Sequence, residues 1–277
     1  KEGDFKDDIY RRDFTINSLS ISLNKKNFGL LLDLFDGRKD LNNKLIKTCL
    51  EPKITFKDDP LRMLRAIRFA SQLSFDIESE TFQGITENKE RIKILSYSRI
   101  SDELNKIIMT EKPSYGFKLL LTSGLLKIIF PEMDNLKGIE KINNHIHKDN
   151  FYHTLKVLDN VSKVSNSLWL RWAAILHDIA KPLTKRYNEK VGWTFHGHED
   201  LGSRMVPKIF KKFNLPTNHH MRFVEKLVRL HLRPIALVKE NITDSAIRRL
   251  LYEAGNDIDK LMILCKADIT SKNHEKV

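Results

Sequence analysis

Two adjacent ligand-type residues, His177 and Asp178, lie near the end of the apolar stretch LRWAAILHDIAK, which Pro182 stops. An imidazole and a carboxylate are costly to bury unless a charged or hydrogen-bonding group pairs with them. A divalent metal ion is the simplest such group, because imidazole nitrogen and carboxylate oxygen are common metal ligands. The second half of the chain holds further residues of these types: His153, His198, His231 and Asp268. The sequence therefore predicts a metal site that only folding can assemble.

The charge of the chain favours phosphate-rich partners. The net charge of the 277 residues is +12, which is typical of proteins that bind nucleic acids or nucleotides. The two cysteines, Cys49 and Cys265, form no CxxC motif and no disulfide framework, so a reducing compartment, the cytoplasm, is expected. Apolar runs stay shorter than the roughly 18 residues of a membrane span, so no membrane partner is expected.

The periodicity of apolar residues predicts a mainly α fold with a small α/β part at the start. Residues 30–35 (LLLDLF) are expected to form a short buried strand, and LIKTCL a second strand. Asp59 and Pro60 predict a helix start, with Asp59 as N-cap and Pro60 as the first helical residue. Residues 135–150 are polar and predict a linker, and KRYNEKVGWTFHGHE a loop with a short hairpin. Further helices are expected at 78–88, 98–109, 114–122, 125–130, 151–165, 168–180, 198–213, 217–232, 243–254 and 257–270.

Two stretches of the first half hold residues suited to nucleotide binding. In RRDFTIN, Arg11 and Arg12 suit a triphosphate, while Asp13 or Asn17 suits a ribose hydroxyl. A helix cap with solvated arginines is the alternative interpretation. In DDPLRMLR, Asp59 and Arg62 lie three residues apart at a helix start, so their side chains can present an acceptor and donors to a nucleobase. A local salt bridge between the two is the alternative.

Read together, these motifs resemble a known family. RRDFTIN, LDLFDGRKDL, DDPLRMLRAIRFASQLSF and SRISDELNKI are similar, in this order, to motifs of bacterial class II tRNA nucleotidyltransferases, which comprise CCA-adding enzymes and poly(A) polymerases. The resemblance implies the end of a nucleotidyltransferase head at 1–48, a helical neck that selects nucleotides and binds RNA at 49–138, and an HD domain at 139–277. It implies nucleotide-binding roles for Arg11, Arg12, Asp13, Asn17, Asp59, Arg62 and Arg65.

Within these motifs the resemblance assigns finer roles. Asp59 and Arg62 match the pair that reads the base of CTP or ATP as a protein template, and Asp58 replaces a more usual Glu. Arg99 and Glu103 match a motif that supports the neck helices, which is a structural role.

One feature of the family is missing from the chain. The two catalytic carboxylates of the family lie upstream of RRDFTIN, in a Gly-Gly loop and a DxD motif, and Asp4, Asp7 and Asp8 lack that setting. Metal-bound carboxylates supply most of the electrostatic stabilisation in phosphoryl transfer. The chain is therefore expected to be a fragment of a longer Mg²⁺-dependent enzyme that does not transfer nucleotides by itself, and its catalytic residues stay unassigned.

The second half resembles the HD phosphohydrolase superfamily. His153, His177, Asp178 and Asp268 match the four-ligand core for one divalent transition metal, and His198 and His231 match the ligands added in two-metal members. His196 competes with His198 for its place. Lys181 is expected to reach a substrate phosphate as a point charge.

The resemblance implies that the parent protein adds CCA to the 3′ ends of tRNA from CTP and ATP. Two alternatives stay open. The only activity of the chain could be metal-dependent phosphohydrolysis, such as the opening of 2′,3′-cyclic phosphates on RNA, or the chain could be a non-catalytic RNA-binding module.

Overall fold

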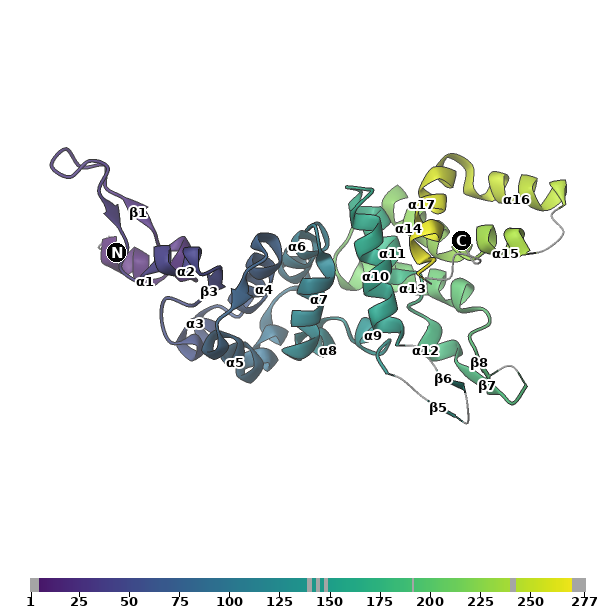
Figure 1. Cartoon of the computed structure of the whole chain (residues 1–277), viewed down its shortest axis with the longest axis horizontal. Helices are drawn as coiled ribbons and strands as arrows, with labels where there is room; N and C mark the ends of the chain where they lie inside the picture. The colour runs from purple at the N-terminus through teal and green to yellow at the C-terminus, as the bar shows by residue number, and fades with distance from the viewer. Residues whose placement is uncertain are drawn as a thin grey trace. The chain divides into compact units, whose positions relative to one another are not determined.

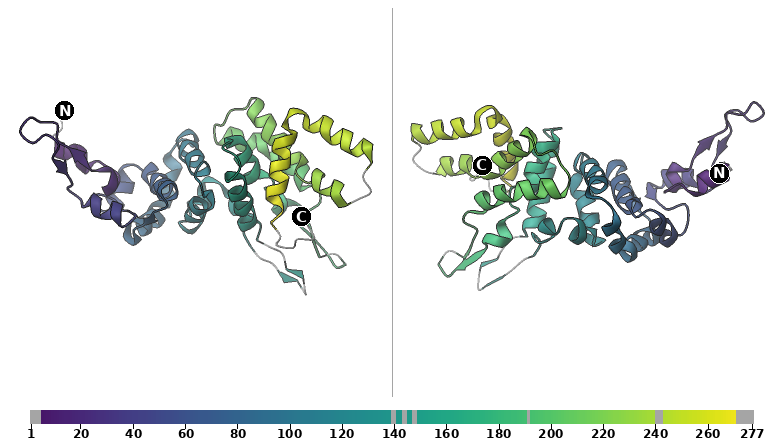
Figure 2. Two further views of the ribbon diagram at one scale, coloured as in Figure 1. Left: turned by 45° about the horizontal axis from the view of Figure 1, so that its top comes forward. Right: turned by 180° about the vertical axis from the view of Figure 1, so that it is seen from behind.

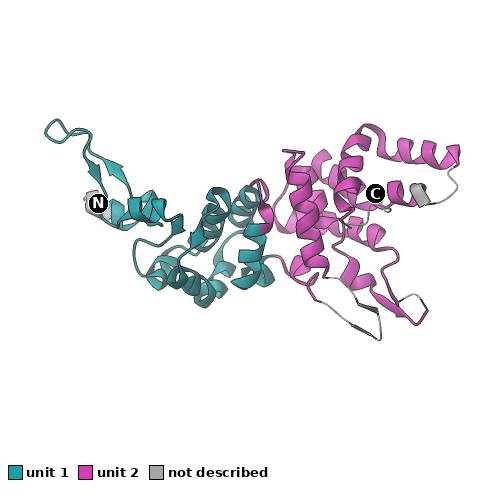
Figure 3. Ribbon diagram, viewed as in Figure 1, with its two compact units in different colours: residues 1–107, 115–129 teal, residues 108–114, 130–277 magenta. Residues whose placement is uncertain are grey.

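The computed structural model describes residues 5–138, 141–142, 145–146, 149–190, 192–239 and 243–270. The chain divides into two compact units, shown in two colours in Figure 3. Unit 1 comprises residues 1–107 and 115–129, and unit 2 comprises residues 108–114 and 130–277. The domain boundaries predicted at residues 48 and 138 stay predictions.

Unit 1 contains short helices and two small sheets (Figure 1). Strands β1 and β2 pair antiparallel, and β3 and β4 pair in parallel. Its elements are α1 (Phe5–Tyr10), the 3-10 helix η1 (Thr15–Asn17), β1 (Ser20–Ile21), β2 (Leu31–Leu32), α2 (Gly37–Asn42), β3 (Leu45–Ile46), α3 (Pro52–Asp58), α4 (Leu61–Leu73), β4 (Asp76–Ile77), α5 (Ser79–Asn88), the 3-10 helix η2 (Lys89–Ile94), α6 (Tyr97–Ile108), α7 (Pro113–Thr122) and α8 (Leu125–Ile129).

Helix α4 forms because its apolar residues recur at helical spacing. Met63, Leu64, Ile67 and Ala70 are fully buried, so one side of the helix packs into the unit. The Asp59 carboxylate accepts a hydrogen bond from the N–H of Leu61 at 3.0 Å. The predicted positions are wrong by one residue, because Pro60 is the N-cap and the helix begins at Leu61, although the Asp59 carboxylate does accept a hydrogen bond at the helix start.

The strand predicted at residues 30–35 is wrong in length and in burial. Strand β2 has only two residues, and Leu30, Leu31 and Leu34 are 52%, 39% and 47% exposed. Among the described residues β2 pairs with β1 alone, and the exposure of these leucines shows that no described segment covers them. The strand predicted in LIKTCL is confirmed as β3, which pairs with β4.

Unit 2 is a helical unit with two short strand pairs, β5–β6 and β7–β8, which Figures 1 and 2 show at its edge. Its elements are α9 (Pro131–Asp134), β5 (Lys141–Ile142), β6 (His145–Ile146), α10 (Asn150–Ser162), α11 (Leu168–Leu176), α12 (Lys181–Thr184), β7 (Arg186–Asn188), β8 (Gly192–Thr194), α13 (His198–Lys212), α14 (His219–Leu230), α15 (Arg233–Lys239), α16 (Asp244–Ala254), the 3-10 helix η3 (Gly255–Asp257) and α17 (Ile258–Asp268).

The core of unit 2 lies among α10, α11, α13, α14 and α17. Trp172 of α11 is fully buried, and its ring centroid lies 5.8 Å from that of Phe213 and 6.2 Å from that of Phe130. This aromatic packing fixes the C-terminal end of α11, where the His177–Asp178 pair follows.

The predicted mainly α fold is confirmed, since helices dominate the described residues. The predicted hairpin is β7–β8. Helix α15 was not predicted, and the predicted linker at 135–150 lies partly outside the described residues. The described helices include none that is long and apolar enough to cross a membrane.

Candidate functional site

A pocket of about 610 Å³ in unit 1 gathers the predicted nucleotide-binding residues. It combines the stretch before and within η1, the start and one side of α4, and the first turn of α6. All seven predicted residues line it, and five arginines against two aspartates make the lining positive. The lining residues are Arg11, Arg12, Asp13, Asn17, Asp59, Leu61, Arg62, Arg65, Phe69 and Arg99.

Asp13 connects the two main walls of this pocket. Its buried carboxylate accepts hydrogen bonds from the backbone N–H of Phe14 at 3.0 Å and from Nδ2 of Asn17 at 3.1 Å. Nε and Nη2 of Arg65 on α4 lie 2.7 and 2.6 Å from its Oδ2 atom. Because charge-assisted hydrogen bonds are short and strong, these two contacts with one carboxylate oxygen fix the RRDFTIN stretch against α4.

The predicted base-reading residues, Asp59 and Arg62, both line the pocket but are held by different partners. Nη2 of Arg62 donates to the backbone carbonyl of Arg11 at 2.7 Å, and its Nη1 lies 3.2 Å from Asp58. The carboxylate of Asp59 pairs instead with Nη2 of Arg99 at 3.2 Å. The local salt bridge between Asp59 and Arg62, which was the alternative interpretation of the sequence, is therefore replaced by the pairs Arg62–Asp58 and Arg99–Asp59.

The family resemblance implied only a structural role for Arg99 and none for Phe69, yet both line the pocket. Forty residues separate Arg99 from Asp59, so no local spacing pointed to their contact. Glu103, one turn further along α6, is buried and pairs with Nε of Arg68. The sequence contained one usable signal for Phe69, its position seven residues after Arg62 on the same side of a helix.

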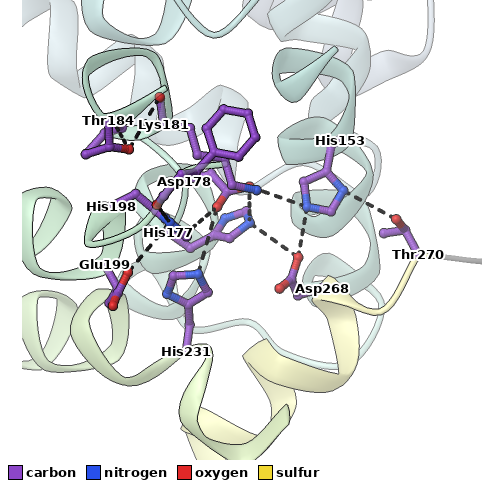
Figure 4. Close-up of polar contacts among 12 residues, drawn as sticks. His153, His177, Asp178, Lys181, Thr184, His198, Glu199, His231, Asp268 and Thr270 are labelled. Atoms are coloured by element: carbon purple, nitrogen blue, oxygen red, sulfur yellow. Dashed lines mark hydrogen bonds and ion pairs between the residues drawn. The ribbon is translucent and has the colours of Figure 1, made fainter. Parts of the chain in front are cut away.

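In unit 2, the six predicted metal ligands come together from the ends of five helices, as Figure 4 shows. His153 lies in the first turn of α10, and His177 and Asp178 follow α11. His198 begins α13, His231 follows α14, and Asp268 is the last residue of α17. Helix packing therefore places side chains that are up to 115 residues apart in sequence at one point.

Asp178 is the centre of this cluster. Its Oδ2 atom lies 3.2 Å from Nε2 of His177 and 3.6 Å from Nε2 of His153. Its Oδ1 atom lies 3.3 Å from Nε2 of His198 and 3.8 Å from Nε2 of His231. The ligand atoms therefore form two groups that share Asp178, and each group is compact enough to hold a metal ion.

Asp268 and Lys181 complete the cluster. The Asp268 carboxylate lies 2.8 Å from Nε2 of His153 and 3.4 Å from Nε2 of His177. The ammonium of Lys181, which was predicted to reach a phosphate, donates to Asp178 at 2.6 Å. His196, the competitor of His198, is exposed, and it belongs to neither group of potential ligands.

The orientation of three imidazole rings fits metal ligation. Nδ1 of His177 donates to the carbonyl of Ala174 at 2.8 Å. In the same way, Nδ1 of His198 and Nδ1 of His231 each donate at 2.7 Å to the carbonyl of the residue three positions earlier, Phe195 and Val228. The opposite atoms, Nε2, are buried and make no hydrogen bond. A neutral ring that donates through Nδ1 has its lone pair on Nε2. The three Nε2 atoms can therefore bind a divalent cation, which would take the place of the proton that the carboxylates favour on His177.

The electrostatics of the cluster also favour a cation. Burial lowers the pKa of His177, but Asp178 and Asp268 outweigh it and raise this pKa to about 10. Burial and the charge of His177 lower the pKa of His231 to about 4. Although burial opposes its ionisation, Asp178 has a pKa well below the ordinary value, because His177 and Lys181 stabilise its charge. The buried carboxylates thus attract positive charge.

Three family models match successive parts of the chain. The "Poly A polymerase head domain" matches residues 1–47, the "Probable RNA and SrmB-binding site of polymerase A" matches residues 74–137, and the "HD domain" matches residues 150–273. Nucleotidyltransferase and HD domains are metal-dependent, in agreement with the two groups of potential ligands around Asp178.

Curated relatives match almost the whole chain. The A-adding tRNA nucleotidyltransferase of Deinococcus radiodurans is 29% identical over 271 residues, which are 95% of this chain and 59% of the relative. The multifunctional CCA protein of Mannheimia succiniciproducens is 30% identical over 275 residues, which are 94% of this chain and 63% of the relative. The chain thus spans about three fifths of the length of these relatives.

Solved structures share the fold. The Thermotoga maritima CCA-adding enzyme in complex with tRNA matches with a TM-score of 0.64 and 23% identity, over 96% of this chain and 58% of that enzyme. A CCA-adding enzyme in complex with CTP matches with a TM-score of 0.64 and 23% identity, over 98% of this chain and 57% of that chain. With three family models matching successive parts in this order, the chain is similar to poly(A) polymerases and tRNA nucleotidyltransferases in its first half and to HD domains in its second half.

Proposed function

We propose that this chain is the nucleotide-selecting and RNA-binding part of a tRNA nucleotidyltransferase that adds C and A residues to tRNA 3′ ends from CTP and ATP. One observation carries the proposal. The seven residues that the sequence motifs assign to nucleotide binding line a single positive pocket of about 610 Å³ in unit 1. A volume of this size suits a small-molecule ligand, and the arginines suit a triphosphate.

The residues of the pocket would divide the work between the two ends of the nucleotide. Arg11 and Arg12 would hold the triphosphate, with Asn17 and Asp13 near the ribose. Asp59 would accept a hydrogen bond from the amino group of cytosine or adenine, and Arg62 would donate to the ring nitrogen beside it. Mg²⁺ would supply charge neutralisation during transfer, and no residue of this chain is assigned as its ligand.

The known activities in the names of similar proteins support the choice of substrates. One relative is an A-adding enzyme and another a multifunctional CCA protein, and the solved CCA-adding enzymes include complexes with tRNA, ATP and CTP. We propose tRNA, CTP and ATP as partners of this chain. We also propose the cytoplasm as its location, which suits the two free cysteines.

Equilibrium binding of the four ribonucleotides tests the proposal. With the 277-residue chain and Mg²⁺, CTP and ATP should bind more tightly than UTP and GTP. Asp59→Ala should remove most of this preference while leaving triphosphate affinity. Equal affinity for all four nucleotides, or no binding, would overturn the proposal.

We propose a second activity for unit 2, the hydrolysis of phosphoesters such as 2′,3′-cyclic nucleotides. The buried cluster around Asp178 supports it, because His153, His177 and Asp268 would hold one divalent transition metal and His198 and His231 would complete a second site. Such ions activate water and stabilise a leaving oxygen. Release of phosphomonoester from 2′,3′-cyclic AMP with Co²⁺, Ni²⁺ or Mn²⁺, and its loss in His177→Ala, is expected. Equal hydrolysis by the variant would overturn the assignment.

A further inference from the structure

Arg99 of α6 holds the carboxylate that the proposed function assigns to base reading. Its Nη2 atom lies 3.2 Å from Oδ2 and 3.5 Å from Oδ1 of Asp59. The N–H of Leu61 donates to Oδ1 from the other side at 3.0 Å. Two donors from different elements therefore fix the carboxylate at the pocket wall, which Arg99 itself also lines.

Arg62, the other base-reading residue, has anchors of its own. Its guanidinium contacts the carbonyl of Arg11 and the carboxylate of Asp58. Asp59 and Arg62 are therefore held apart as two separate groups. Without Arg99, the Asp59 carboxylate would be open to the guanidinium of Arg62, which lies three residues along the chain in the first turn of α4. An ion pair between the two would occupy the donor and the acceptor that the base needs.

We propose that Arg99 is a specificity-determining positioning residue, which keeps Asp59 available to the nucleobase by preventing its pairing with Arg62. This inference rests on the proposed function. Cytosine and adenine present an amino group that donates to a carboxylate, whereas uracil and guanine present a carbonyl oxygen at the same place. An Asp59 carboxylate held in the pocket selects the first two bases and repels the others.

The expected effect is on selection rather than on folding. The Arg99 and Asp59 side chains are 50% and 34% exposed, and exposed ion pairs contribute little to stability. Loss of the Arg99 charge also lowers the affinity for every triphosphate alike. The quantity that isolates the positioning role is therefore the ratio of dissociation constants, UTP over CTP and GTP over ATP.

The experiment compares five variants of the 277-residue chain by equilibrium binding with Mg²⁺. Arg99→Met should lower both ratios by about fivefold or more, the lower end for a lost base contact, and Arg99→Lys should restore part of the loss. Arg91→Met is the matched control, because Arg91 donates to the Lys57 carbonyl and is not among the residues that line the pocket. It should leave the ratios unchanged.

The double variant Asp59→Asn/Arg99→Met tests the route of action. If Arg99 acts through Asp59, adding Arg99→Met to Asp59→Asn should not change the ratios further. Wild-type ratios in Arg99→Met, or a further fall in the double variant, would overturn the inference while leaving the proposed function intact. A wild-type chain that binds all four nucleotides equally would instead overturn the proposed function, and the inference with it.

Discussion

Asp178→Asn should remove most of the stabilisation of the chain by divalent transition metals. The substitution preserves the shape of the side chain but replaces an oxygen ligand by an amide nitrogen, which has no lone pair for a metal. Both oxygens of Asp178 face imidazole Nε2 atoms at 3.2 to 3.8 Å. No other residue belongs to both groups of potential ligands among the described residues, so this single change affects every ion that the cluster holds.

The expected magnitude follows from mass action. At a metal concentration 100 times the dissociation constant, a bound ion adds about 2.7 kcal/mol to the free energy of unfolding. For a chain of this size that corresponds to a rise in Tm of about 5–10 °C. Loss of a residue that hydrogen-bonds to a metal ligand lowers metal affinity by up to about 100-fold, and loss of a shared ligand should lower it at least as much. A 100-fold loss would leave about 0.4 kcal/mol of stabilisation, or a rise in Tm of about 1–2 °C.

Thermal unfolding with and without Co²⁺, Ni²⁺ or Mn²⁺ measures this difference. The metal-dependent part of Tm is compared, because Asp178→Asn also removes the ion pair with Lys181 and changes the metal-free chain. Asp200→Asn is the matched control, since Asp200 lies on α13 close to His198 in sequence but is 57% exposed. It should keep the full metal-dependent rise. The reasoning is refuted if Asp178→Asn keeps that rise, or if metal does not raise the Tm of the wild-type chain.

Three further predictions concern base selection, core electrostatics and the thiols. Arg62→Ala should reduce the preference for CTP and ATP over UTP and GTP by roughly 5- to 150-fold in binding assays, and an unchanged preference would exclude Arg62 from base reading. Arg68→Met leaves the buried carboxylate of Glu103, whose side chain is 4% exposed, without its guanidinium partner. Urea unfolding should therefore show a loss of about 3–5 kcal/mol in the free energy of unfolding. A loss below about 1 kcal/mol would contradict this, even though Lys106 also contacts Glu103. Burial raises the pKa of Cys49 and of Cys265 to about 12, so mass spectrometry should find both thiols unmodified by iodoacetamide at pH 8.5 in the folded chain and alkylated in urea. Because each folded-state pKa is above its unfolded value, burial of the two neutral thiols stabilises the folded chain fully below about pH 9, and this contribution to the free energy of unfolding decreases as the pH rises toward 12. Rapid alkylation of the folded chain would contradict the burial.

The sequence predicted those features that depend on residue type and local spacing. The start of α4 follows from Asp59 and Pro60, and the buried His177–Asp178 pair follows from its apolar surroundings. In both cases the groups that decide the structure are close in sequence, such as the N–H group of Leu61, which bonds to Asp59 two residues earlier. Periodicity also located most helices, because one side of each is apolar.

Features that depend on contacts between distant segments were not predicted. An apolar run at residues 30–35 indicates burial only if another layer covers it, and β2 has a single neighbouring strand among the described residues. The position of Arg62 three residues after Asp59 pointed to their pairing, whereas the actual partner of Asp59, Arg99, comes from α6. The choice between His196 and His198 depended on the turn that places the Phe195 carbonyl 2.7 Å from Nδ1 of His198.

The number of metal ions in unit 2 follows from how the cluster is divided. His153 and His177 lie within 3.6 Å of one oxygen of Asp178, and His198 and His231 lie within 3.8 Å of the other. Asp268 contacts only the first pair of histidines. This division favours two ions, because a single ion on the His153 side would leave Nε2 of His198 and of His231 buried and without a hydrogen bond.

Removal of one histidine from each side distinguishes the two stoichiometries. With two ions, His153→Ala and His198→Ala should each reduce the metal content by about one equivalent, measured by elemental analysis after metal soaking and gel filtration. With one ion on the His153 side, His153→Ala would lose the metal and His198→Ala would keep it. His219→Ala controls for loss of a surface imidazole, since His219 contacts His220 and belongs to neither group of potential ligands. Full metal content in His198→Ala, with circular dichroism showing a folded chain, would exclude the two-ion site, because the second group would then keep only two of its three ligands, Asp178 and His231.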